Sequence, residues 1–140
     1  MLGQLIWACL NPDGARDLWV PVKANAAGET SIGIAEQIST LIDSTTTPLG
    51  DGLTYTGASK ACDKYARIVG TIFTDHASTL YVDQSQDNTN WDYSSSFPVT
   101  ASTGLAFSVE VIAPYCRLRV VNSAGAAQTV LRAYMRGRVI

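Results

Sequence analysis

The sequence predicts an all-β protein, an antiparallel β-sandwich of jelly-roll type that follows an N-terminal β-hairpin arm. Three observations predict it. Short runs rich in β-branched and aromatic residues recur from residue 53 onward, turn residues separate these runs at regular intervals, and no long helical pattern follows residue 45. The chain of 140 residues is long enough for one domain with an appended arm.

The expected strands of the sandwich alternate between apolar and polar positions, which is typical of a sheet with one buried face. The predicted strands are Leu53–Gly57, Tyr65–Thr74, Ser78–Ser85, Trp91–Val99, Leu105–Ile112, Tyr115–Asn122 and Thr129–Val139. Polar turns occupy residues 86–90 and 123–126. We place the sandwich domain at residues 46–140.

Residues 1–45 form the expected arm and linker. Apolar runs at residues 4–10 and 18–22 flank an Asn-Pro-Asp-Gly turn, and Pro21 confines the second strand to an edge. The hairpin carries more apolar surface than two strands bury alone, so it docks on another chain or packs on its own domain. The residues expected at this contact are Leu5, Trp7, Trp19 and Pro21. Residues 30–45 fit a strand, a helix or a loop.

Composition limits the classes of function. Only 16% of the residues are charged and the formal net charge is −2, so global charge indicates neither nucleic acid nor a membrane as partner. No apolar run is long enough for a membrane span, and the first residues do not resemble a secretory signal. The odd count of three distant cysteines fits a reducing cytoplasm, and we expect Cys116 to be a small buried side chain.

Catalytic and cofactor motifs are missing from the sequence, so we expect no enzymatic activity and no cofactor. The single histidine, His76, falls in a predicted turn after Asp75, where a Ser-His-Asp triad would need a shaped pocket. The oxygen-rich stretch Asp83–Asp92 resembles a calcium loop, but Asn88 replaces its glycine and Ser94 its bidentate glutamate. A hairpin turn with aspartate and asparagine side chains bonded to their own backbone is the preferred interpretation.

Two groups of side chains are candidates for binding. An aromatic set with neighbouring polar residues could stack on sugar rings, although Trp91 also suits a core position: Trp91, Tyr93, Phe97, Asp87 and Asn90. Five of the ten basic residues lie on the last two predicted strands, at positions 117, 119, 132, 136 and 138. We prefer a protein interface or intrachain pairing over nucleic acid for these arginines, and we expect Arg136 and Arg138 at an interface.

Three further stretches carry a resemblance. Residues 44–57 contain a Thr-Pro-Leu segment and a small-residue turn that lead into a Thr-Tyr-Thr-Gly strand. Residues 78–92 follow the pattern of a hairpin that reads S-x-D-g-x-n-W-d, and residues 115–129 follow y-x-R-v-x-v-x-N-x-x-g-x-a-q-T. Residues 18–29 resemble a short W-x-x-V-k element that precedes such modules. In these motifs the chain resembles the small β-sandwich structural proteins, decoration or accessory proteins, of tailed-phage virions.

The resemblance implies a virion structural protein that is made in the host cytoplasm and works by binding its neighbours. Its expected partners are further copies of itself, as a homo-oligomer such as a trimer, and other virion proteins such as the major capsid protein. The preferred role is capsid decoration, with the connector and tail as other positions in the particle. A carbohydrate-binding β-sandwich module is the alternative function.

Overall fold

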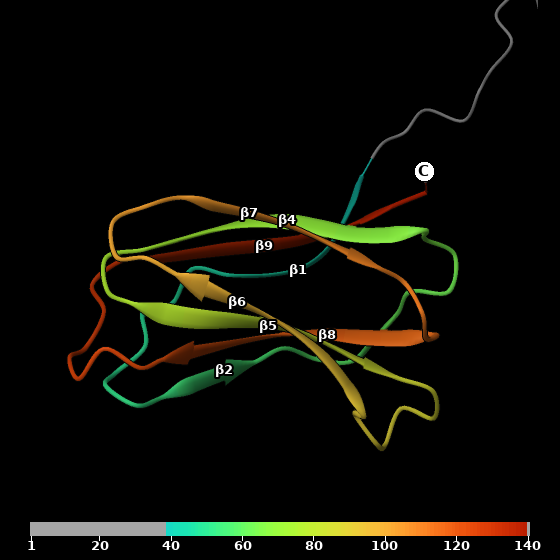
Figure 1. Ribbon diagram of the computed structural model, residues 1–140, viewed down its shortest axis with the longest axis horizontal. Helices are drawn as coiled ribbons and strands as arrows, with labels where there is room; N and C mark the ends of the chain where they lie inside the picture. The colour runs from blue at the N-terminus through green and yellow to red at the C-terminus, as the bar shows by residue number, and fades with distance from the viewer. Residues whose placement is uncertain (1–38, 140) are drawn as a thin grey trace, which may run out of the picture. The chain divides into compact units, whose positions relative to one another are not determined.

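The computed structural model describes residues 39–139, which belong to a compact unit that runs from Gln37 to Ile140. This unit consists of two antiparallel sheets that form two layers (Figure 1). The predicted N-terminal hairpin, with Leu5, Trp7, Trp19 and Pro21, lies outside the described residues.

The first sheet has four strands in the order β1-β9-β4-β7. Their bounds are β1 Thr40–Thr45, β4 Arg67–Thr74, β7 Leu105–Glu110 and β9 Leu131–Arg138. Along β9 the burial alternates strictly, with Leu131, Ala133 and Met135 buried and Arg132, Tyr134 and Arg136 exposed. This period of two fixes which face of the sheet packs on the core.

The second sheet has the order β2-β8-β5-β6, with β3 paired to β8 in addition. Its strands are β2 Thr54–Thr56, β3 Lys60–Ala61, β5 Ser78–Ser85, β6 Tyr93–Val99 and β8 Tyr115–Asn122. The two central strands, β5 and β8, pair over their full length from Ser78↔Asn122 to Ser85↔Tyr115. Consecutive strands therefore alternate between the sheets except at the β2–β3 and β5–β6 connections, which stay within the second sheet. Figure 1 shows the two layers that result.

The prediction of an all-β antiparallel sandwich is confirmed. Ser78–Ser85 and Tyr115–Asn122 were predicted with the bounds that the structure has, because turn residues stand at both ends of each. A jelly roll winds two Greek keys into two sheets. The two observed strand orders are compatible with that winding, and the jelly-roll name stays a prediction.

The boundary expected after residue 45 differs from the structure. Residues 30–45 were placed with the arm and linker and left open between strand, helix and loop. Residues 40–45 form β1 and pair with β9 from Thr40↔Gly137 to Thr45↔Ala133. The pairing shifts between Leu41 and Asp43, so the strand lacks the clean alternation by which a sequence reveals a strand. The short β3 was also not predicted, because two residues carry no pattern.

Alternating residues of both sheets meet in one core. Its largest fully buried apolar side chains are Ile68, Ile72, Leu80, Leu118, Leu131 and Met135. Cys62 and Cys116 are also completely buried and free, and for Cys116 this confirms the expected role of a small core side chain. Contact with Cys62, together with burial, raises the pKa of the Cys116 thiol, so this sulfur stays protonated and unreactive.

Gly70 allows β4 to lie close to both of its neighbours. A β-carbon at this position would come within 2.0 Å of the Tyr134 carbonyl oxygen and 2.5 Å of the Phe107 ring. The backbone oxygen belongs to the sheet itself, so it has no freedom to move aside. The sequence shows Gly70 only as a break in an apolar run, and the structure explains it as a packing requirement.

We expect Gly70→Ala to lower the free energy of unfolding by about 1–3 kcal/mol, the usual cost of forcing an extra methyl group into a packed site. Urea unfolding followed by tryptophan fluorescence measures it. Gly104→Ala is the matched control, since no atom lies within 4 Å of its β-carbon position, and it should change stability by less than about 0.5 kcal/mol. Equal effects of the two substitutions would contradict the packing argument.

Candidate interaction surface

The outer face of the second sheet is organised around one buried carboxylate. Asp83 on β5 is 2% exposed and accepts hydrogen bonds from the side chains of three neighbours. Arg117 Nε lies 3.0 Å from its Oδ2, Arg119 Nε and Nη2 lie 2.9 Å from Oδ2 and Oδ1, and Ser94 Oγ lies 2.6 Å from Oδ1. The register makes these contacts possible, because Asp83 stands opposite Arg117 on β8 and Ser94 on β6. We call Asp83, Ser94, Arg117 and Arg119 the Asp83 cluster.

Two aromatic rings cover the arginines of this cluster. The Arg117 guanidinium lies 4.2 Å from the centre of the Trp91 ring, and that of Arg119 lies 4.0 Å from the centre of the Tyr81 ring. Arg119 forms two bonds to the carboxylate and Arg117 forms one, and each guanidinium group also has an aromatic ring over one of its faces. This face of the sandwich therefore uses its charges internally.

The electrostatic state of Asp83 follows from two opposed effects. Burial alone would raise the pKa of this carboxyl, but the hydrogen bonds from Arg119, Ser94 and Arg117 outweigh burial and hold the pKa below its ordinary value. A depressed pKa stabilises the fold above the ordinary carboxyl pKa near 4, and the gain disappears as the pH falls below that value.

The β5–β6 hairpin turn is closed by Asp87. Its carboxylate accepts hydrogen bonds from the backbone amides of Thr89 and Asn90, from the Asn90 side chain and from Ser85 Oγ. Asn88 takes a φ of +62°, which asparagine tolerates better than most residues other than glycine. The turn interpretation of this stretch agrees with these contacts. Within residues 39–139 no group of three potential metal ligands converges.

The five residues predicted to bind a glycan do not form one platform. Phe97 belongs to the margin of the core, with its ring centre 5.7 Å from that of Phe107, whereas Trp91 lies on Arg117. Tyr93 is 46% exposed. Asp87 and Asn90 bond to each other within the turn. Glycan binding at these residues stays a prediction.

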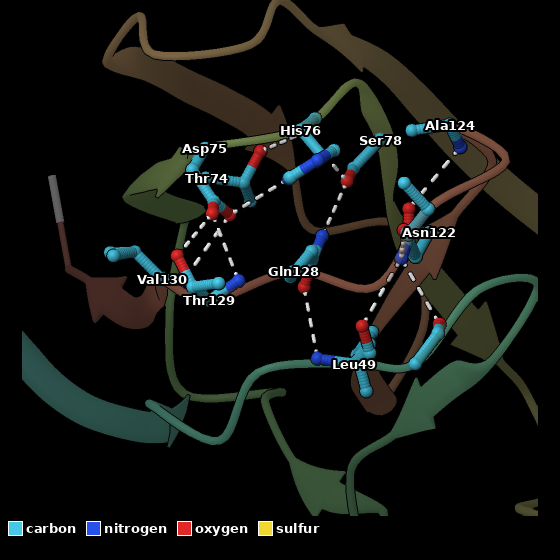
Figure 2. Close-up of polar contacts among 12 residues, drawn as sticks. Leu49, Thr74, Asp75, His76, Ser78, Asn122, Ala124, Gln128, Thr129 and Val130 are labelled. Atoms are coloured by element: carbon cyan, nitrogen blue, oxygen red, sulfur yellow. Dashed lines mark hydrogen bonds and ion pairs between the residues drawn. The ribbon is translucent and has the colours of Figure 1, made fainter.

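A polar network ties together the loops at one end of the sandwich (Figure 2). Asn122, fully buried at the end of β8, donates from Nδ2 to the carbonyl oxygens of Leu49, Gly50 and Ala126. Gln128 accepts from the Leu49 amide at 3.1 Å and donates to Ser78 Oγ at 2.7 Å. These amide side chains hold the chain segment that leaves β1 and enters β2.

His76 and Asp75 belong to the same end of the molecule and have structural partners (Figure 2). Asp75 accepts from the amide and hydroxyl of Thr129 and from the Val130 amide, and these bonds lower its pKa. His76 Nδ1 lies 3.3 Å from Asp75 Oδ1. The buried Ser78 hydroxyl, however, donates to the His76 backbone carbonyl and not to its ring. These three residues therefore do not have the arrangement of a Ser-His-Asp triad.

The outer face of the first sheet contrasts with that of the second. Strand β9 exposes Arg132, Arg136 and Arg138, and Arg67 stands beside Arg138 on β4. We call these four residues the arginine face. Arg132 packs on the Phe73 ring at 4.8 Å, and Arg136 donates to the Ser39 carbonyl at 3.0 Å. Arg67 donates to the Ser108 hydroxyl at 3.0 Å. All three of these partners are uncharged, and one acidic residue, Glu110 on β7, stands opposite Arg67.

A shallow groove runs over the same sheet beside the arginines. It has a volume of about 290 Å³ and a mostly apolar lining that includes Val69, Ala106, Phe107 and Tyr134, with Arg136 at its margin. Tyr134 is 37% exposed and Leu41, opposite Arg136 on β1, is 48% exposed. The sequence analysis placed Arg136 and Arg138 at an interface but missed Tyr134 and Val69. Alternation along β4 and β9 puts all of them on one face, which is the signal that could have found them.

Known proteins include a family that matches this chain in sequence and structures that are similar in fold. A family model described as the N-terminal domain of the uncharacterised protein YqxG matches residues 27–136. The chain belongs to this family. No curated protein sequence matches the chain. The YqxG N-terminal domain family therefore accounts for most of the length of the chain, including every strand of the first sheet except the last two residues of β9.

Two solved structures are similar to this YqxG-type domain. The PBSX exported protein XepA matches with a TM-score of 0.67 at 16% identity, over 90% of this chain and 51% of XepA, so the chain spans about half the length of that protein. This likeness shows the shared fold. A chain of Bacillus endospore appendages, described as disulfide-linked pili, has a TM-score of 0.45 at 10% identity, over 79% of this chain and 100% of its own, which is too low to carry an argument. Within residues 39–139 the structure contains no helix able to span a membrane.

The contribution of the Asp83 cluster to the stability of the fold can be tested by substitution. Asp83→Asn leaves two half-buried arginines without their carboxylate and should lower the free energy of unfolding at pH 7 by about 2 kcal/mol, less than for a fully buried pair because both arginines are about a quarter exposed. The loss of stability below pH 4 should also become shallower than in the wild type.

Urea unfolding at several pH values measures both effects. Asp92→Asn, at an exposed site beside the same hairpin, is the control and should be close to neutral. Some acid sensitivity will remain in the Asp83 variant, since Asp75 and Asp87 also have lowered pKa values. An unchanged stability at pH 7 would show that the cluster does not hold this face.

Proposed function

We propose that the chain is a non-enzymatic structural protein of a tailed-phage virion, a capsid decoration or accessory protein. It binds neighbouring capsid or tail subunits through its N-terminal arm and a surface of the sandwich. The observation that supports this most is the contrast between the two outer faces. On one face both arginines bond to a carboxylate of the same chain, whereas the other face presents arginines around an apolar groove.

The composition of that second face is typical of a protein interface. Arginine and tyrosine are the residues that most often contribute binding energy where proteins meet, and a small apolar groove among them accepts a side chain of the partner. The groove, at about 290 Å³, is at the lower limit of a small-molecule pocket. Its size and openness favour one protruding side chain over a small ligand.

The motifs that resemble phage structural proteins have structural roles in this fold. Ser85 and Asp87 close the β5–β6 turn, and Asn122 and Gln128 fasten the Thr-Pro-Leu segment through Leu49. Similarity to phage proteins at these residues reflects how the turns and loops of a β-sandwich are stabilised. It supports a shared structural module, located in the virion or outside the cell, and it points to no reaction.

The arm is tested by incorporation into particles. Trp7→Ala combined with Trp19→Ala should reduce the copies of the protein per purified particle at least tenfold, because buried tryptophans commonly contribute 2 kcal/mol or more each to a protein contact. Quantitative mass spectrometry of particles of the encoding phage measures it.

Trp91→Ala is the matched control, because Trp91 contacts Arg117 of its own chain. This variant should be incorporated like the wild type. Incorporation of the arm variant at the wild-type level would reject the arm as the contact.

A further inference from the structure

We infer that Cys62 and Cys116 form a disulfide bond by thiol–disulfide exchange, and that this bond holds the short strand β3 on β8. The inference goes beyond the proposed function, because it concerns a modification within the chain and does not depend on which subunit the protein binds. Cys62 directly follows β3, and Cys116 is the second residue of β8. The two cysteines are far apart in the sequence, and the pairing of these strands brings them together.

The register of β3 and β8 places the two cysteines on the same face of the second sheet. Lys60 stands opposite Cys116, and the Cys62 amide donates to the Pro114 carbonyl at 2.7 Å. Cys62 is therefore a diagonal neighbour of Cys116, and both side chains are fully buried in the core. The two thiols contact each other, so no other side chain has to be displaced from between them.

β3 is the part of the sheet that can adjust to the bond. It has two residues and pairs only with β8, and Cys62 lies beyond its end, in a turn where the Tyr65 amide donates to the Cys62 carbonyl at 3.0 Å. Diagonal neighbours in antiparallel strands have Cα atoms about 7–8 Å apart, slightly more than the usual span of a disulfide. A small movement of this short strand toward β8 closes that difference, while Cys116 stays in place on the long strand.

The two thiols differ in how readily they ionise. Contact with Cys116 lowers the pKa of the Cys62 thiol, whereas the same contact, together with burial, raises the pKa of Cys116. Cys62 is therefore the first sulfur to react.

The exchange takes place in two steps. The Cys62 thiolate attacks one sulfur of a low-molecular-weight disulfide such as oxidised glutathione, and one thiol leaves. Cys116 then gives up its proton, attacks the Cys62 sulfur of the mixed disulfide and releases the second thiol. Two thiols of the chain become one disulfide, and the oxidant is reduced to two thiols that carry the two protons.

Burial determines when the exchange occurs. An oxidant reaches neither sulfur in the closed domain, where the Cys62 thiol donates to the Ala113 carbonyl at 3.2 Å. The bond therefore forms while the chain folds, or when β3 separates from β8 by local opening. A reducing cytoplasm leaves both thiols free, and an oxidising environment allows the bond.

Oxidative refolding of the full-length chain tests the inference. The reduced protein is unfolded in urea, refolded with a mixture of reduced and oxidised glutathione, and alkylated in urea before its intact mass is measured. The chain has three cysteines, so a bond between Cys62 and Cys116 leaves Cys9 as the one alkylated thiol, and peptide mapping should link residues 62 and 116. Folded, reduced protein that receives the same mixture without urea should form the bond at least about tenfold more slowly, because both sulfurs are buried.

Cys9→Ser is the matched variant that keeps the pair. It should form the bond like the wild type, and its oxidised form should have a urea midpoint about 1–2 M above that of the same variant reduced with dithiothreitol. Cys62→Ser should lose both the bond and this gain.

Three outcomes would overturn the inference: three alkylated thiols in the wild type after oxidative refolding, a link that joins Cys9 to one member of the pair, or an unchanged urea midpoint of the oxidised Cys9 variant. These measurements are independent of incorporation into particles. Failure of this inference would therefore leave the proposed function unaffected.

Discussion

The crossing from the first sheet to the second depends on two buried amide side chains. Strand β1 ends at Thr45 in one layer and β2 begins at Thr54 in the other, so the backbone between them must turn polar groups toward the interior. Asn122 and Gln128 satisfy these groups through the backbone of Leu49 and Gly50. A buried carbonyl or amide left without such a partner costs free energy comparable to a lost hydrogen bond, so this fastening fixes how the two layers are connected.

The same fastening explains why three separate stretches of the sequence share motifs with other small sandwiches. Leu49 lies in the first stretch, Ser78 in the second, and Asn122 with Gln128 in the third, and the network joins them at one end of the molecule (Figure 2). Each motif therefore contributes residues to the same hydrogen-bond network at one end of the sandwich. The described network links the loops at one end, and the Asp83 cluster links the side chains on the outer face of the second sheet, so the outer face of the first sheet has the most groups available for a partner.

Much of the fold could be predicted from the sequence, because β5 and β8 alternate cleanly between turn residues and β9 alternates arginines with core residues. The prediction for residues 30–45 was left open between strand, helix and loop, because a register shift interrupts the alternation of β1. The candidate surface was harder to predict. All five arginines of the last two strands look alike in the sequence, yet β8 and β9 belong to different sheets. Asp83 stands opposite Arg117 and diagonal to Arg119, and only the register of β5 and β8 reveals that both arginines have this carboxylate beside them.

The central claim is that the outer face of the first sheet is the surface that assembly covers. Hydroxyl-radical footprinting of the assembled and dissociated protein tests it with two tyrosines of the same chain. Tyr134 on β9 is 37% exposed and Tyr93 on β6 is 46% exposed, so both react readily in the single chain. The account predicts that assembly protects Tyr134 several-fold and leaves Tyr93 unchanged. Protection of Tyr93 with continued labelling of Tyr134 would contradict it.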